Sequence, residues 1–148
     1  NGGSGVITPD LTIEESATWR GAVAHTHINP IYVVAPSTTD ARLSQVTAQC
    51  GGFIYAASLM GVTGARAQVS SSAGDLVKRI RKTSELPIAV GLGVSTREQA
   101  QGVAAYADGV IVGSAFIKLI QEAEDEASGL EAVRTLASEL SKGVREGR

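Results

Sequence analysis

Two glycine-bearing stretches, Gly91-Leu-Gly-Val-Ser95 and Asp108-Gly-Val-Ile-Val-Gly-Ser-Ala115, decide the fold of this chain. Each is a short apolar run that stops at glycine and then gives way to a helical pattern. Their spacing suits two consecutive strand–helix units of a parallel α/β protein, in which the carboxyl ends of neighbouring strands lie side by side. Glycines at these ends leave backbone N–H groups bare, which is the arrangement that holds a phosphate.

The composition excludes several classes of function. The chain has 148 residues, of which 43% are hydrophobic and 4% aromatic, with 17 glycines and a net charge of −2. This profile is typical of a helix-covered parallel sheet, and the lack of a basic stripe disfavours nucleic acid as a partner. No apolar run reaches the ~20 residues of a membrane span, so no membrane partner is expected. The single cysteine, Cys50, predicts no disulfide, no metal site and a cytoplasmic location.

Five strand–helix units repeat along the chain. The predicted strands are Gly5–Thr8, Ile31–Ala35, Phe53–Ala57, Ile88–Gly91 and Gly109–Val112. The predicted helices are Ile13–His25, Thr39–Ala48, Ala73–Lys82, Thr96–Tyr106 and Ala115–Glu122, with a last helix near Leu130–Val144. Continuous apolar strands that alternate with amphipathic helices indicate a parallel sheet with right-handed crossovers.

The starts of the predicted helices single out one of them. Ser or Thr lies three residues before a carboxylate at Thr12–Glu15, Ser37–Asp40, Ser72–Asp75 and Ser95–Glu98, which predicts capping boxes. The helix after Gly113-Ser114 has no such carboxylate. Because a helix N-terminus free of negative charge attracts an anion, the pattern predicts a phosphate site here. The alternative is an ordinary tight turn between a strand and a helix.

The longest predicted connection follows the third strand and runs from Ser58 to Ser70. Long loops at the carboxyl ends of parallel strands commonly act as binding loops or lids. In this loop Gly64 offers an amide to a phosphate, Thr63 a hydroxyl and Arg66 a positive charge. The alternative interpretation is a solvated loop.

Two further residues are candidates for a site. Asp10 follows the first predicted strand, where its carboxylate either faces the mouth of a barrel or starts a helix. Tyr55 lies in a predicted strand, and its ring either lines the interior or packs in the core. The sequence shows no convincing acid–base pair, nucleophile with a base, or metal-ligand constellation.

Taken in order, these motifs resemble the tryptophan synthase alpha chain family over essentially the whole chain. The matching stretches are Gly5–Leu11 with Glu14-Glu15, Ile31–Pro36, Gly52–Ser58, Gly61–Gly64, Val90–Ser95 and Ala107–Ala115. The combination of Gly-Val-Thr-Gly after Tyr-x-x-Ser with the two glycine strand ends makes the resemblance specific. It implies an α/β fold in which residues 1–148 form strands four to eight of one (β/α)8 TIM-barrel domain. Because a complete barrel needs ~250 residues, roughly its first two-fifths is expected to be absent.

The resemblance also implies an activity and a set of site residues. The family is a lyase of tryptophan biosynthesis that cleaves indole-3-glycerol phosphate by a retro-aldol reaction to indole and glyceraldehyde 3-phosphate. The implied phosphate-binding residues are Gly64, Gly93, Gly113 and Ser114. The implied substrate-pocket residues are Ile7, Tyr55, Leu92 and Ile111, with Thr63 supporting a catalytic aspartate and Asp10 near the partner surface.

The same resemblance places the chemistry and the cofactor elsewhere. The family's catalytic glutamate and aspartate lie on the second strand and the loop after it, in a Glu-Leu-Gly-x-Pro-x-Ser-Asp-Pro type motif that this sequence lacks. Indole passes to a beta chain in an alpha2-beta2 complex, and pyridoxal phosphate belongs to that beta chain, so no cofactor is expected here. We therefore expect the chain alone to be inactive while keeping weak phosphate affinity.

Two alternatives remain at this stage. One is a partial barrel without activity that dimerises, exchanges elements or aggregates through its two open sheet edges. The other is a different phosphate-binding barrel enzyme, such as a phosphoribosyl isomerase or a thiamine-phosphate synthase relative. The second alternative does not predict Tyr-x-x-Ser-x-x-Gly-Val-Thr-Gly after the third strand of this chain.

Overall fold

A computed structural model describes residues 2–57, 66–91 and 93–148 of the chain. The strands form a parallel sheet in the order β1-β2-β3-β4-β5. They are β1 Gly5–Thr8, β2 Asn29–Val34, β3 Ile54–Ala57, β4 Ile88–Gly91 and β5 Gly109–Ile111. The helices are α1 Ala17–Val23, α2 Asp40–Thr47, α3 Arg66–Ile80, α4 Arg97–Ala104, α5 Ser114–Glu122 and α6 Glu126–Glu146. The predicted strand–helix order is confirmed, and every predicted strand is found.

Three helices begin several residues from their predicted starts. Helix α6 starts at Glu126 instead of near Leu130. Helix α1 starts at Ala17 instead of Ile13, because residues 13–16 form a turn in which the Ser16 hydroxyl donates to the Ile13 carbonyl at 2.8 Å. Helix α3 starts at Arg66, so the prediction of a loop reaching Ser70 is wrong for residues 66–70. Its carboxyl end, Ile80, lies close to the predicted Lys82.

The predicted capping boxes are wrong in position. Ser37 and Ser95 are each replaced as N-cap by a neighbouring threonine, Thr39 for α2 and Thr96 for α4, because each threonine immediately precedes its helix. Ser72 lies inside α3, six residues after its start at Arg66. A capping box that was not predicted lies at the start of α6, where the Asp125 carboxylate accepts from the Ser128 backbone amide at 2.7 Å.

The Thr12–Glu15 pair forms its hydrogen bonds away from a helix start. The Thr12 hydroxyl donates to the Glu15 carboxylate at 2.9 Å and accepts from the Glu15 amide at 3.3 Å. Because α1 starts at Ala17 with Ser16 as N-cap, this pair stabilises the turn that precedes the helix.

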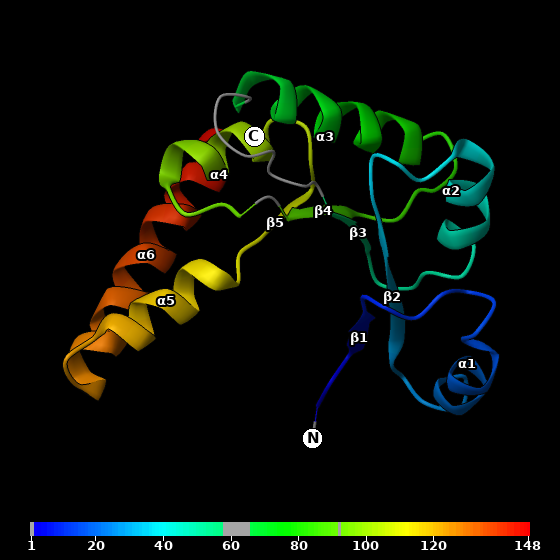
Figure 1. Ribbon diagram of the computed structural model, residues 1–148, viewed down its shortest axis with the longest axis horizontal. Helices are drawn as coiled ribbons and strands as arrows, with labels where there is room; N and C mark the ends of the chain where they lie inside the picture. Colours follow the sequence, from blue (N-terminus) through cyan, green and yellow to red (C-terminus); the bar gives the residue numbers. More distant parts are fainter. Residues whose placement is uncertain (1, 58–65, 92) are drawn as a thin grey trace.

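The two faces of the sheet differ in what covers them. Ile54, Ile88 and Val90 point to the helix-covered face and are completely buried in a core shared with Leu43 and Ile80. Figure 1 shows the helices arranged around the outside of the curved sheet, and no helix of the described part of the chain covers the other face. The sheet is therefore an arc of parallel strands with an uncovered inner face.

Register places the predicted pocket residues on that inner face. Side chains alternate along a strand, and register partners in a parallel pair share a face. Tyr55 pairs with Ala89, and Ile111 pairs with Gly91, so both lie opposite the buried core positions. Ile7 pairs with Ile31, and Val33 further along that strand pairs with Tyr55, so Ile7 shares this face.

Helix α6 lies unusually close to α4. A Cβ added at Gly143 would come 2.2 Å from the Arg97 carbonyl oxygen, and one added at Gly147 would come 2.3 Å from the Gln101 carbonyl oxygen. The Arg97 guanidinium reaches across to Glu139 at 3.5 Å and also pairs with Glu146. Small residues thus let two helix backbones meet, and ion pairs frame the contact.

Gly143→Ala is expected to lower the free energy of unfolding by about 1–3 kcal/mol, because the new methyl group has no room against the Arg97 carbonyl. The matched control is Gly102→Ala on α4, where nothing lies within 4 Å of an added Cβ. That substitution should raise stability by about 0.5–1 kcal/mol through helix propensity. Urea unfolding measures both, and equal effects of the two substitutions would contradict the close approach.

Asp108 ties the start of β5 to the start of β4. Its carboxylate accepts from the Ile88 amide at 2.8 Å and pairs with the Arg81 guanidinium at 3.0 Å. Burial opposes ionisation of this group, but the Ile88 amide and Arg81 outweigh it and hold the pKa of Asp108 below its ordinary value. The Arg148 guanidinium donates to the Asp108 carbonyl at 2.6 Å.

The stability of the fold should depend on the ionisation of Asp108. Because its folded pKa is lowered, the carboxylate stabilises the fold above the unfolded value of about 4, and this is lost as pH falls through the folded pKa. Asp108→Asn should lower stability near neutral pH by about 0.5–1 kcal/mol, a modest figure because the side chain is 41% exposed.

Urea midpoints of wild type and Asp108→Asn, followed from neutral pH to about pH 2, should converge at the acid end. Asp75→Asn is the control, since Asp75 pairs with Lys78 on its own helix and both side chains are well exposed. A difference between Asp108→Asn and wild type that is constant with pH would contradict the role of the charge.

A polypeptide of these 148 residues is expected to self-associate. Among the described strands, β1 and β5 each pair on one side only. Val6 on β1 is 41% exposed, and Ile117 and Ile120 on α5 are 53% and 56% exposed. Light scattering should show a mass above the monomer that rises with concentration, and Val6→Lys on the edge strand should reduce it. A stable monomer at high concentration would contradict this expectation.

Candidate functional site

The N-terminus of α5 is free of capping side chains. Its N-cap is Gly113, whose φ is −128°, and no side chain accepts a hydrogen bond from the first amides. The first turn contains no acidic residue, as the sequence predicted. Since the first amides of a helix lack intrahelical acceptors, Ser114 and Ala115 present N–H groups to whatever lies in front of the helix.

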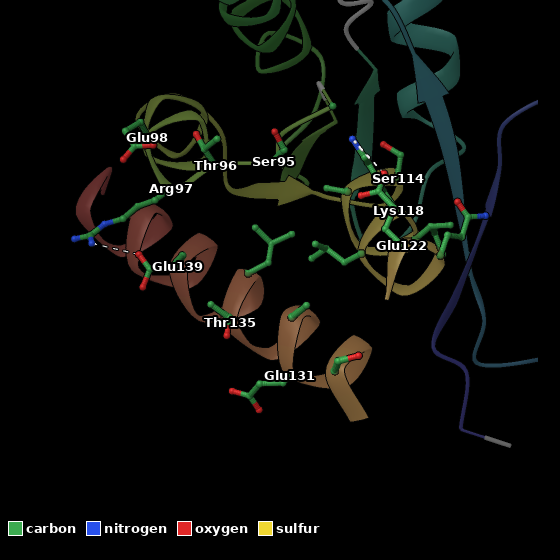
Figure 2. A pocket seen from close by; sticks show the side chains of 18 residues that line it. Ser95, Thr96, Arg97, Glu98, Ser114, Lys118, Glu122, Glu131, Thr135 and Glu139 are labelled. Carbon is green, nitrogen blue, oxygen red and sulfur yellow. Dashed lines mark hydrogen bonds and ion pairs between the residues drawn. The ribbon is translucent and has the colours of Figure 1, made fainter. Parts of the chain in front are cut away.

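Gly93 lies at the end of the neighbouring strand unit and meets α5 at one groove. Its φ of +65° is in the left-handed region that favours glycine. Gly93 and Ser114 line the same open groove, of about 1500 Å³, which runs between α4, α5 and α6. Figure 2 shows Ser95 and Thr96 on the α4 side of the groove and Ser114 on the α5 side. The two glycine stretches therefore come together, as the sequence predicted.

The charged side chains of the groove are largely paired with each other. Arg97 is held by Glu146 and Glu139, and the hydrogen bond and charge of Glu146 raise the pKa of the Arg97 guanidinium above its usual value. Lys118 lies 3.8 Å from Glu122 and is well exposed (Figure 2). Because these cations have carboxylate partners, the positive potential at Ser114 comes mainly from backbone amides and the helix dipole.

Gln99 was missed by the sequence reasoning, which assigned the α4 cap to Ser95 and Glu98. Its Oε1 accepts from the Ser95 amide at 2.8 Å and from the Thr96 amide at 3.2 Å. The Thr96 hydroxyl in turn accepts from the backbone N–H of Gln99 at 3.3 Å. The available signal was the Thr-x-x-Gln spacing one residue further along, which is also a capping-box pattern.

The inner face carries an aromatic ring above a glycine. A Cβ added at Gly91 would lie 2.5 Å from the Tyr55 hydroxyl oxygen and 2.7 Å from its Cε2 atom. The ring therefore leans from β3 over β4, in the space that the missing side chain leaves. Ile111 is the register partner of Gly91 on β5, so it borders the same place. Ile7 shares the face, but β2 separates its strand from β3.

Four other predicted site residues have different outcomes. Thr63, Gly64 and Leu92 lie outside the described residues. Asp10 is exposed in the turn after β1, and the alternative that it starts a helix is wrong because α1 begins at Ala17. It lines a small cavity of about 180 Å³ with Tyr32 and Arg42.

The described residues also bear on metals and membranes. Among residues 2–57, 66–91 and 93–148, no group of three or more His, Cys, Asp or Glu side chains is placed to hold a metal ion. No helix in this part of the chain combines the length and apolar character needed to cross a membrane.

Comparison with known sequences decides the family. The family described as tryptophan synthase alpha chain matches residues 1–145. The chain belongs to this family. The tryptophan synthase alpha chain of Streptomyces avermitilis is 61% identical over 146 residues, covering 99% of this chain and 53% of that protein. The alpha chain of Streptomyces coelicolor is 57% identical over 144 residues, covering 97% of this chain and 53% of that protein.

Solved structures of the family agree with the fold. Tryptophan synthase from M. tuberculosis, in an open form with BRD0059 bound, matches with a TM-score of 0.82 and 42% identity over 97% of this chain and 51% of that one. A mutant tryptophan synthase alpha-subunit from Pyrococcus furiosus matches with a TM-score of 0.77 and 31% identity over 93% of this chain and 55% of that one. These neighbours are TIM barrels, and this chain spans about half the length of the relatives that it matches.

Gly91→Ala is expected to displace the Tyr55 ring and to lower the free energy of unfolding by about 1–3 kcal/mol, because the methyl group would overlap the ring. Gly74→Ala on α3 is the control, since nothing lies within 4 Å of an added Cβ there. Urea unfolding gives the cost, and the NMR signals of the Tyr55 ring report its displacement. Unchanged ring signals in Gly91→Ala would contradict the placement of Tyr55.

Proposed function

We propose that these residues form the phosphate-binding region, and part of the indole-binding region, of an enzyme that cleaves indole-3-glycerol phosphate. The reaction is a retro-aldol cleavage to indole and glyceraldehyde 3-phosphate, a lyase step of tryptophan biosynthesis. The observation that carries the proposal is the meeting of Gly93 with the uncapped N-terminus of α5 at one groove, in a chain of this family.

In this proposal backbone amides hold the substrate phosphate. The amides of Gly93, Gly113 and Ser114 donate to phosphate oxygens, and Gly64 adds a further amide from the connection after β3. Charge-assisted hydrogen bonds of this kind are short and strong. The dipole of α5 favours the dianion, because no carboxylate in its first turn cancels the positive end.

The inner face of the sheet takes the indole end of the substrate. Tyr55 and Ile111 flank the surface beside Gly91, and Ile7 lies farther along the same face. Leu92, which follows Gly91 in the sequence, is a further pocket residue of the proposal. Thr63 supports the catalytic aspartate. The glutamate and aspartate that transfer protons belong to the stretch that the resemblance places before this one, so the residues here bind and orient the substrate.

The remaining parts of the proposal concern setting and partner. Residues 1–148 belong to one barrel domain that acts in the cytoplasm without a cofactor of its own. The partner is a tryptophan synthase beta chain, which carries pyridoxal phosphate and receives the indole in an alpha2-beta2 complex. The exposed turn at Asp10 lies on the surface that meets it.

Calorimetric titration with glycerol 3-phosphate, with glycerol as the uncharged comparison, tests the phosphate site. Ser114→Asp places a carboxylate in front of the first amides of α5 and should weaken binding at least tenfold, equivalent to about 1.4 kcal/mol. Gln121→Glu adds the same charge near the other end of α5 and should change binding by less than about twofold. Binding of glycerol as tight as that of its phosphate, or equal effects of the two variants, would contradict the site.

Indole release from indole-3-glycerol phosphate tests whether these residues bind the substrate without carrying the catalytic acid and base. A polypeptide of these 148 residues should release indole only at the uncatalysed rate, because the implied acid and base are not among them. Turnover clearly above that of a buffer control would show that this stretch carries catalytic groups of its own.

A further inference from the structure

We propose that Gln99 is a positioning residue for the phosphate: its neutral side-chain amide holds the turn from Gly93 to Ser95 without adding a carboxylate at that turn. This inference rests on the proposed function of the groove. It concerns a side chain that contacts backbone next to the phosphate-binding amides, so Gln99 acts through the turn and not by touching substrate.

Hydrogen bonds define how Gln99 holds the turn. Its Oε1 accepts from the Ser95 amide at 2.8 Å, from the Thr96 amide at 3.2 Å and from the Ser95 hydroxyl at 3.3 Å. Ser95 follows Gly93 by two residues, and Gly93 is in the left-handed conformation. One side-chain oxygen of Gln99 therefore fixes the end of the turn whose other end is Gly93.

The contacts of Gln99 also decide which amides remain for a phosphate. The amides of Ser95 and Thr96 are already taken by Gln99. On the α4 side of the groove this leaves Gly93 and the first amides of α4 itself, and on the α5 side the first amides of that helix. Gln99 thus removes the two amides between Gly93 and α4 from competition for an anion.

The absence of charge on this cap is the second part of the argument. A glutamate could accept from the same amides, and capping boxes commonly use one. At α6 the N-cap is the carboxylate of Asp125, and its partner in the box is the Ser128 hydroxyl. At α4 and α5 the capping residues Thr96, Gln99 and Gly113 carry no charge.

Other charged groups around the turn do not fill this role. Glu98 belongs to the first turn of α4 and lines the groove, but it is exposed, makes no hydrogen bond to the Ser95 or Thr96 amide in the described part of the chain, and lies away from Ser114 in Figure 2. Arg97 is engaged by Glu139 and Glu146, and Lys118 lies near Glu122. A carboxylate at position 99 would be held at the turn itself by the Ser95 and Thr96 amides.

The test compares Gln99→Glu with Gln101→Glu, an exposed position on the same helix that adds the same charge without touching the turn. The probe is glycerol 3-phosphate, titrated near neutral pH at about 20 mM and about 500 mM salt. Gln99→Glu should keep its urea midpoint, because the carboxylate still accepts from the two amides, yet bind about fivefold or more weakly at low salt. The ratio of its dissociation constant to that of wild type should shrink at high salt, and Gln101→Glu should bind like wild type.

A purely structural cap gives a different pattern. Gln99→Ala removes the hydrogen bonds without adding charge, so it should bind glycerol 3-phosphate more weakly than wild type. The ratio of the two dissociation constants should not change with salt. Binding by Gln99→Glu equal to wild type, or equal losses in Gln99→Glu and Gln101→Glu, would overturn the proposal. If Gln99→Glu fails to fold, wild-type affinity in Gln99→Ala would likewise overturn it. Wild-type protein that binds no glycerol 3-phosphate would instead overturn the phosphate site itself.

Discussion

The parallel register between β4 and β5 is the constraint on which the site depends. Val90 pairs with Val110 and Gly91 with Ile111, so both strands end at the same edge of the sheet. Gly93 and Gly113 follow two residues after these ends. Asp108 sets this register from the opposite end by accepting from the Ile88 amide. A shift of one residue in this register would move Gly93 away from Gly113. It would also turn Ile111 from the inner face, which it shares with Tyr55, to the helix-covered face.

A second constraint is the close contact between α4 and α6. Gly143 lets the α6 backbone lie against the Arg97 carbonyl, which places α6 as one wall of the groove. Arg97 also pairs with Glu139 and Glu146, so its guanidinium links α4 to α6. Because Arg97 is engaged in this helix contact, the anion of the proposed site would be bound by backbone amides.

Local signals in the sequence were enough for the sheet and for α5. Apolar runs that alternate with helical patterns predicted the strands, and the missing carboxylate after Gly113 predicted the uncapped helix. They were insufficient for the start of α4, because Ser95 and Thr96 are adjacent and each has a suitable partner three residues later. Only the geometry of the turn at Gly93 selects Thr96 with Gln99.

Contacts between segments were also beyond the sequence pattern. Nothing local to Tyr55 shows that its ring lies over Gly91, because that contact requires the register of β3 on β4. The start of α3 at Arg66 was missed since the stretch before Ala73 is rich in serine and the Ser72–Asp75 spacing suggested a later start. In physical terms, glycine and periodicity are local properties, whereas helix starts and ring positions depend on neighbours in space.

The central claim is that backbone amides at two glycine strand ends bind the phosphate of the substrate. The most direct measurement is an NMR titration of backbone amide signals with glycerol 3-phosphate. The account predicts that the largest shifts fall on Gly93, Gly113 and Ser114, with small shifts on α6. Shifts centred on the side chains of Arg97 or Lys118, or spread evenly over the chain, would contradict it.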